Sequence, residues 1–100
     1  MKAIAKAFVV GENGLAQLAL FPDEIMAFKA KRTLLRKPKA TEEVSSSRRR
    51  AEITSAAVDK EAGALEIAFA GGDSWKFEVP SEELKGAQQI VAELAATGTA

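Results

Sequence analysis

Apolar and polar residues alternate in several short segments of this 100-residue chain. Successive side chains of a β-strand point to opposite faces of the sheet, so a period of two predicts strands. The pattern is clearest in ALEIAF (64–69) and WKFEV (75–79), which are separated by Gly71-Gly72-Asp73. Glycine accepts the positive φ angles of a tight turn, so this region predicts a β-hairpin.

Three further strands are predicted near the N-terminus, over residues 3–10, 15–21 and 24–32. The turns between them contain Asn13-Gly14, which favours positive φ, and Pro22-Asp23, in which proline presets φ. In the strand over 24–32, alternation places Met26 and Phe28 on one face and Ile25, Ala27, Lys29 and Lys31 on the other.

The middle of the chain has a weaker pattern. Pro38 interrupts it, and Ser45-Ser46-Ser47 is polar. We expect a loop from residue 33 and a short, exposed strand near residues 43–48. A turn over 51–53 then leads to another predicted strand over 54–58.

A single helix is predicted at the C-terminal end. Pro80 ends the strands, Ser81 is suited to cap a helix, and Glu82 and Glu83 favour the positive end of its dipole. Apolar residues then repeat at helical spacing to about Ala96, namely Leu84, Ala87, Ile90, Val91 and Leu94. The expectation is one domain over 1–97, built from about seven antiparallel strands and this helix, with a frayed tail over 98–100.

Composition excludes several kinds of site. The chain has no cysteine and no histidine, so it lacks disulfides, thiolate and imidazole metal ligands, and the commonest general base. Glu42-Glu43 would point to opposite faces of a strand, and the helix dipole explains Glu82-Glu83. We therefore expect no catalytic residues, no metal and no cofactor. With no apolar run of about 20 residues and no signal-peptide cleavage pattern, the expected location is cytoplasmic.

Charge is unevenly distributed although the formal net charge is zero. Residues 1–50 contain eleven Lys and Arg against five Asp and Glu, a balance of +6, whereas residues 51–100 contain three against nine, a balance of −6. Nine of the basic residues lie between Lys29 and Arg50. The candidate ligand-binding residues are Arg32, Arg36, Lys37, Lys39, Arg48, Arg49 and Arg50.

The basic residues admit several interpretations. They suit a protein or peptide partner, or a peripheral anionic membrane surface, to which each would contribute about 1 kcal/mol. Nucleic acid is a weaker alternative, because only Phe28 lies nearby for base stacking and its position fits the core better. An exposed strand also permits homo-oligomerisation or peptide addition. Alternatively, the lysines protect a sheet edge and the arginines bridge to the acidic half.

The order of the segments LAQLALFPDEIMAF (15–28), AEITSAAVD (51–59) and ALEIAFAGGDSWKFEVP (64–80), followed by a helix, resembles bacterial pleckstrin-homology-like domains. The resemblance covers about residues 8–96. It implies a mainly β fold, a split, partly open barrel of seven strands capped by the C-terminal helix, with Trp75 and Phe77 in the core against that helix. Ser45–Arg50 stands where the family has apolar residues, so either that strand is exposed or the alignment slips there.

The resemblance implies a structural framework rather than a chemistry. Eukaryotic members that bind phosphoinositides carry basic residues in the loop between their first two strands, but here that loop is Gly11–Gly14, which is short and acidic. Phosphoinositide binding is therefore not expected. The sequence predicts a non-catalytic binding module that uses the basic residues between 29 and 50.

Overall fold

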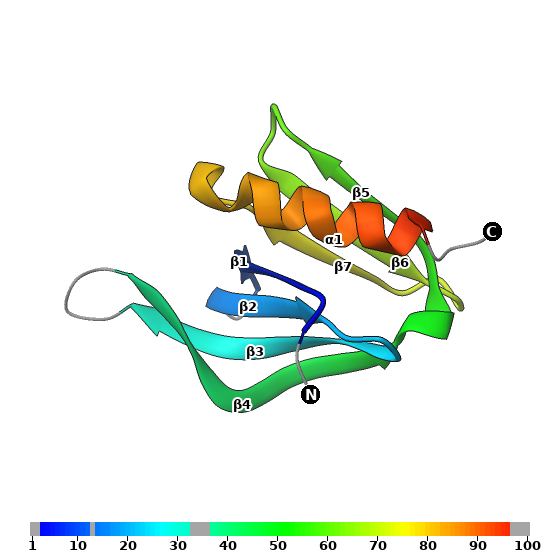
Figure 1. The fold of residues 1–100 in the computed structure, drawn as a ribbon, viewed down its shortest axis with the longest axis horizontal. Helices are drawn as coiled ribbons and strands as arrows, with labels where there is room; N and C mark the ends of the chain where they lie inside the picture. Colours follow the sequence, from blue (N-terminus) through cyan, green and yellow to red (C-terminus); the bar gives the residue numbers. More distant parts are fainter. Residues whose placement is uncertain (1–2, 13, 33–36, 97–100) are drawn as a thin grey trace.

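The computed structural model describes residues 3–12, 14–32 and 37–96. Within these residues, seven strands form one antiparallel sheet, and an α-helix follows the last strand (Figure 1). The strands are β1 (Ala5–Gly11), β2 (Gly14–Leu20), β3 (Glu24–Arg32), β4 (Pro38–Arg49), β5 (Ile53–Asp59), β6 (Ala64–Phe69) and β7 (Ser74–Glu78). The helices are the 3-10 turns η1 (Arg50–Glu52) and η2 (Ser81–Glu83) and the α-helix α1 (Leu84–Ala96). The tail expected over 98–100 lies outside the described residues.

The prediction of a mainly β fold with seven strands and one C-terminal α-helix is confirmed, but the sheet is not closed. Its strand order is β4-β3-β2-β1-β7-β6-β5, so β4 and β5 are the two edges. β1 and β7 join at the single register pair Val10↔Glu78, which divides the sheet into a β1–β4 half and a β5–β7 half. No helix among the described residues is long and apolar enough to cross a membrane.

The predicted hairpins have the expected turn chemistry. Gly71 and Gly72, between β6 and β7, have φ angles of 95° and 97°, a backbone conformation that side chains disfavour. The pairs Leu65↔Phe77 and Ile67↔Trp75 fix the register of this hairpin. Its apolar residues consequently face the inside of the bent sheet.

Helix α1 links the two halves because it packs on both β1 and β5. Its own residues Ala87 and Ile90 are fully buried. A Cβ added at Gly86 would lie only 2.6 Å from the carbonyl oxygen of Lys6, so the helix lies close against the backbone of β1. Glycine at this position permits that contact.

The start of the helical region differs from the prediction. Ser81 lies inside η2 rather than capping the helix, because Pro80 occupies the N-cap position, and the Ser81 hydroxyl donates to Glu82 Oε2 at 3.3 Å. Glu83 has a role across the sheet, since its Oε1 accepts the backbone N–H of Phe8 at 2.9 Å. This bond satisfies a β1 amide near the place where β1 and β7 separate.

Two expectations about the core were wrong. Ile25 and Ala27 of β3 are buried in the core, whereas Phe28 lies on the opposite face and is only partly buried. Trp75 and Phe77 pack at the margin of the core and are partly exposed. Helix α1 packs mainly on β1 and β5, and β7 joins β1 only through its last residue, Glu78, so the aromatic side chains of β7 lie at the edge of the core.

Strand β4 is much longer than predicted. It runs along the bottom of Figure 1 from the β3–β4 hairpin at the left to η1 at the right, over Pro38–Arg49. Two register irregularities against β3 interrupt its pairing, one on each side of Phe28. The strand predicted near residues 43–48 is its second half, whereas the residues before it were predicted as a loop. β-Bulges of this kind break the period of two, which explains why the first half was missed.

Candidate functional site

The structure divides the predicted basic residues between the two ends of β4. Arg32, Lys37 and Lys39 lie beside the β3–β4 hairpin, whereas Arg48–Arg50 lie at the junction with η1 (Figure 1). At about 3.3 Å per strand residue, Lys39 and Arg48 are roughly 30 Å apart along β4. Arg36 falls outside the described residues. The candidates therefore form two groups rather than one patch.

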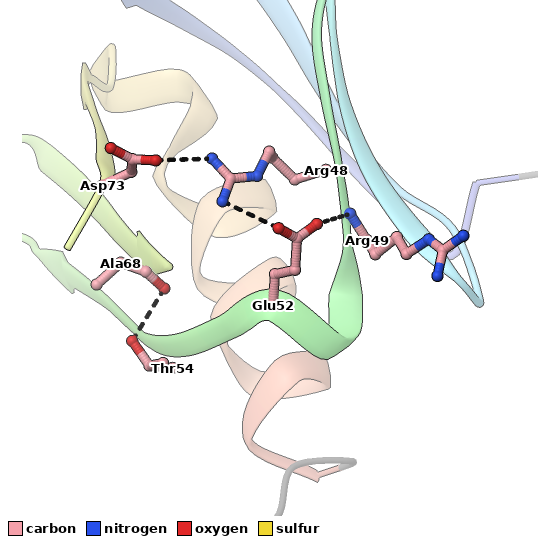
Figure 2. A network of polar contacts seen from close by, with 6 residues as sticks. All are labelled: Arg48, Arg49, Glu52, Thr54, Ala68 and Asp73. Carbon is pink, nitrogen blue, oxygen red and sulfur yellow. Dashed lines mark hydrogen bonds and ion pairs between the residues drawn. The ribbon is translucent and has the colours of Figure 1, made fainter. Parts of the chain in front are cut away.

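Arg48 lies in the angle between the two halves of the sheet and binds groups of its own chain (Figure 2). Its Nη2 contacts Glu52 Oε1 at 3.1 Å, and its Nη1 contacts Asp73 Oδ2 at 3.5 Å. The guanidinium carbon lies 4.3 Å from the centre of the Phe69 ring. Only 23% of the Arg48 side chain is exposed, because β4 pairing places Arg48 opposite buried Ile25. Arg48 thus connects β4 to the β6–β7 hairpin.

Glu52 completes this junction. Its Oε2 accepts the backbone N–H of Arg49 at 3.2 Å, while its other oxygen pairs with Arg48. The backbone bond from Arg49, followed by the hydrogen bond and charge of Arg48, lowers the pKa of Glu52 below its ordinary value of 4.5. The Arg49 side chain points away from this cluster in Figure 2 and is exposed.

Arg50 holds the same junction from the other side. Its Nη1 donates to the carbonyl oxygens of Phe21 at 3.2 Å and Pro22 at 3.3 Å, and its backbone N–H donates to Asp23 O at 3.0 Å. We call Arg48, Arg49, Arg50 and Glu52 the arginine corner. The side chains of Arg48 and Arg50 make contacts within the chain. For Arg48, these contacts agree with the alternative in which the arginines bridge to the acidic half of the chain.

The opposite end of β4 also carries positive charge, contributed by residues of β3 and β4 that flank the hairpin between them. Lys31 and Lys39 are register partners on adjacent strands, and Arg32 pairs with Pro38. Lys31, Lys37 and Lys39 are exposed and have no ion pair within the described part of the chain. Lys29, further along β3, is instead paired with Glu43 at 2.7 Å. We call Lys31, Arg32, Lys37 and Lys39 the basic tip.

A cleft that the sequence did not predict lies between the two halves of the sheet. It has a volume of about 370 Å³. Apolar lining is contributed by Ala16 and Ala27 from one half and by Trp75 and Phe77 from the other. Trp75 packs edge-on against Phe69, with ring centroids 4.9 Å apart. The alternation in β7 identified these aromatic residues, but it could not show that the sheet remains open beside them.

Polar groups also converge on the cleft. Ser46 of β4 and Ser74 of β7 line it from opposite sides, and Lys29 and Lys76 lie among its charged residues. Within the described residues, the hydroxyls of Ser46 and Ser74 and the indole N–H of Trp75 have no hydrogen-bond partner. These donors can bind the oxygen atoms of a ligand. The described residues contain no group of three or more Asp, Glu, His or Cys able to hold a metal ion.

No protein-family model matches the chain, and no curated protein matches it. The resemblance to pleckstrin-homology-like domains therefore rests on the sequence segments quoted above. The functional argument depends on the basic tip, the arginine corner and the cleft.

Proposed function

We propose that this chain is a non-catalytic binding module of pleckstrin-homology-like fold, and that its basic tip recognises an acidic surface on a protein partner. The observation that carries the proposal is the direct opposition of Lys31 and Lys39, two exposed lysines with no ion pair among the described residues. Of the candidates from the sequence, Arg32, Lys37 and Lys39 belong to this site.

Opposed lysines are unfavourable in an isolated sheet. Like charges directly across two strands destabilise the pairing by a few tenths of a kcal/mol, whereas an opposite-charge pair stabilises it by a similar amount. The arrangement becomes favourable when an anionic group binds between the two ammonium groups. Long-range attraction by the tip would also speed the encounter with an acidic partner.

Magnitudes favour a protein partner over a membrane. The four residues of the basic tip would contribute together about 4 kcal/mol at an anionic bilayer, which corresponds to a dissociation constant of about 1 mM. That attraction is too weak to hold the chain on a membrane. A folded partner adds shape complementarity and hydrogen bonds to the same charges. The partner can also be a second copy of this chain, whose acidic C-terminal half would bind the basic tip of the first.

The test uses an oligoglutamate peptide as the acidic probe, with amide chemical shifts followed by NMR. The tip variant is Lys31→Glu/Lys39→Glu. The matched control is Lys60→Glu/Lys85→Glu, which makes the same change in net charge at two other exposed lysines. We expect low-salt binding centred on the tip, weakened about tenfold or more in the tip variant and much less in the control.

Two results would overturn the proposal. Equal weakening in both double variants would show that only net charge matters. Tip-dependent binding to anionic vesicles without binding to oligoglutamate would identify a membrane, rather than a protein, as the target. Sedimentation equilibrium of the unliganded chain distinguishes self-association from recognition of a different protein.

A further inference from the structure

The cleft is the central part of a longer depression across the open side of the sheet. A hollow of about 300 Å³ adjoins it on one side and shares Gly11, Lys76 and Phe77 with it. A hollow of about 590 Å³ adjoins it on the other side and shares Leu15, Lys29 and Ser45. An elongated depression of this kind suits an extended chain better than a compact small molecule.

The lining of the cleft indicates the kind of group that binds there. Trp75 and Phe77 offer apolar aromatic surface, and Ala16 and Ala27 leave room opposite them because their side chains are small. At about 370 Å³, the cleft lies at the lower end of the roughly 300–1,000 Å³ typical of ligand pockets. It is therefore suited to a single bulky side chain, with the neighbouring residues of the ligand in the flanking hollows.

The donors around this apolar surface favour a peptide backbone as the remainder of the ligand. The Ser46 and Ser74 hydroxyls and the Trp75 indole N–H have no partner among the described residues. Carbonyl oxygens of an extended peptide are suitable acceptors for all three. Ser46 and Ser74 come from different halves of the sheet, so an extended segment lying between β4 and β7 would meet donors on both sides.

The lysines beside the cleft are compensated within the protein, unlike Lys31 and Lys39 of the basic tip, which have no ion pair among the described residues. Lys29 pairs with Glu43 at 2.7 Å, and Lys76 pairs with Glu66 at 3.6 Å. Glu12 also lines the cleft. A strongly anionic ligand would have to compete with these carboxylates for the two lysines, so the cleft favours an uncharged segment.

We propose that the cleft binds an extended, uncharged peptide segment of a partner protein through one large apolar side chain. That side chain lies against Trp75 and Phe77, and the peptide carbonyls accept hydrogen bonds from Ser46, Ser74 and Trp75. This site is separate from the basic tip. Binding depends on apolar contact and hydrogen bonds, so it persists at salt concentrations that abolish binding to the tip.

The test begins with selection from a phage-displayed library of random peptides, carried out on the full chain at near-physiological salt. Selected peptides are then synthesised and titrated while the fluorescence of Trp75, the sole tryptophan, is recorded. Ser46→Phe fills the cleft from an exposed position of β4. Ser47→Phe is the matched control, because Ser47 is the adjacent exposed residue and its side chain lies on the opposite face of the strand.

We expect the selected peptides to share a large aliphatic or aromatic residue and to shift the Trp75 emission. Their affinity should fall about tenfold or more in Ser46→Phe and change less than about twofold in Ser47→Phe. It should also be retained in Lys31→Glu/Lys39→Glu, which separates this site from the basic tip. Circular dichroism checks that each variant is folded.

Three outcomes overturn the inference. Selection that yields no peptide binding to the wild-type chain shows that the cleft does not recognise extended segments. Peptides that bind Ser46→Phe as well as the wild type bind elsewhere. Acidic peptides whose binding is lost in Lys31→Glu/Lys39→Glu support the basic tip and refute the cleft as the peptide site.

Discussion

Replacing Arg48 by alanine tests whether this residue stabilises the fold or binds a ligand. Its guanidinium contacts Phe69, Glu52 and Asp73, and its side chain is 23% exposed. The sequence alone placed Arg48 among the ligand-binding candidates. The observed contacts instead predict that its loss destabilises the junction between the two halves of the sheet.

The expected magnitude follows from the separate contacts. The cation–π contact with Phe69 contributes about 1 kcal/mol, between the values for exposed and desolvated pairs. The ion pairs with Glu52 and Asp73 involve carboxylates that are 42% and 74% exposed, so together they contribute at most about 0.5 kcal/mol. The covered alkyl stem contributes a further ~1 kcal/mol. Arg48→Ala should therefore lower the free energy of unfolding by about 2 kcal/mol, a large part of the 5–15 kcal/mol typical of a domain.

Two variants separate these contributions. Arg48→Met retains an apolar stem without the charge, so it should lose only about 1 kcal/mol. Arg49→Ala is the matched control, because the Arg49 side chain is exposed and points away from the cluster, and it should change stability by less than about 0.5 kcal/mol. Urea unfolding followed by Trp75 fluorescence and circular dichroism measures all three. Equal small losses for Arg48→Ala and Arg49→Ala would refute the structural role of Arg48.

Two further predictions concern the helix contact and the arginine corner. Gly86→Ala should destabilise the chain by about 1–3 kcal/mol in urea unfolding, although alanine normally stabilises a helix, because its Cβ would lie 2.6 Å from Lys6 O. Ala92→Gly, at an exposed position of α1, gives the propensity effect alone, and a stabilising Gly86→Ala would disprove the close contact. The lowered pKa of Glu52 means that its ionised form adds stability above its unfolded value near 4.5, and that this stability is lost as pH falls through the lower folded pKa. The stability difference between wild type and Glu52→Gln should therefore be present at pH 7 and disappear in acid; a difference that does not change with pH would contradict it.

Much of the secondary structure was predictable because turn residues and alternation agree. The β3 strand has the predicted bounds, and the β6–β7 hairpin forms at Gly71-Gly72. The second half of β4 was predicted near residues 43–48, but its first half was missed because the strand has little apolar contrast and its pairing is irregular opposite Phe28. The alternation of apolar and polar residues reveals a strand only when one of its faces is buried. The exposed edge strand β4 has no buried residue, so the alternation is absent.

The sites were less predictable because they depend on distant pairs. Alternation divides β3 into two faces but does not show which face meets the core, so Phe28 was assigned to the wrong one. The spacing of Arg48 and Glu52 was visible in the sequence, whereas the contact of Arg48 with Asp73 joins residues 25 positions apart. The cleft exists because β1 and β7 separate beyond their single register pair. That separation depends on two distant strands, so the pattern within either segment does not predict it.

The arginine corner and the cleft share a structural connection, so the stability of the junction and the shape of the cleft depend on the same contacts. Arg48 packs on Phe69, and Phe69 packs on Trp75, whose ring lines the cleft. Besides the corner, the two halves of the sheet are joined by α1 and by the short β1–β7 contact. Positive charge therefore has a different setting at each end of β4: at the corner Arg48 joins the two walls of the cleft, and at the tip the exposed Lys31 and Lys39 have no ion pair among the described residues. Loss of Arg48 should consequently weaken peptide binding in the cleft while leaving binding of oligoglutamate at the tip unchanged.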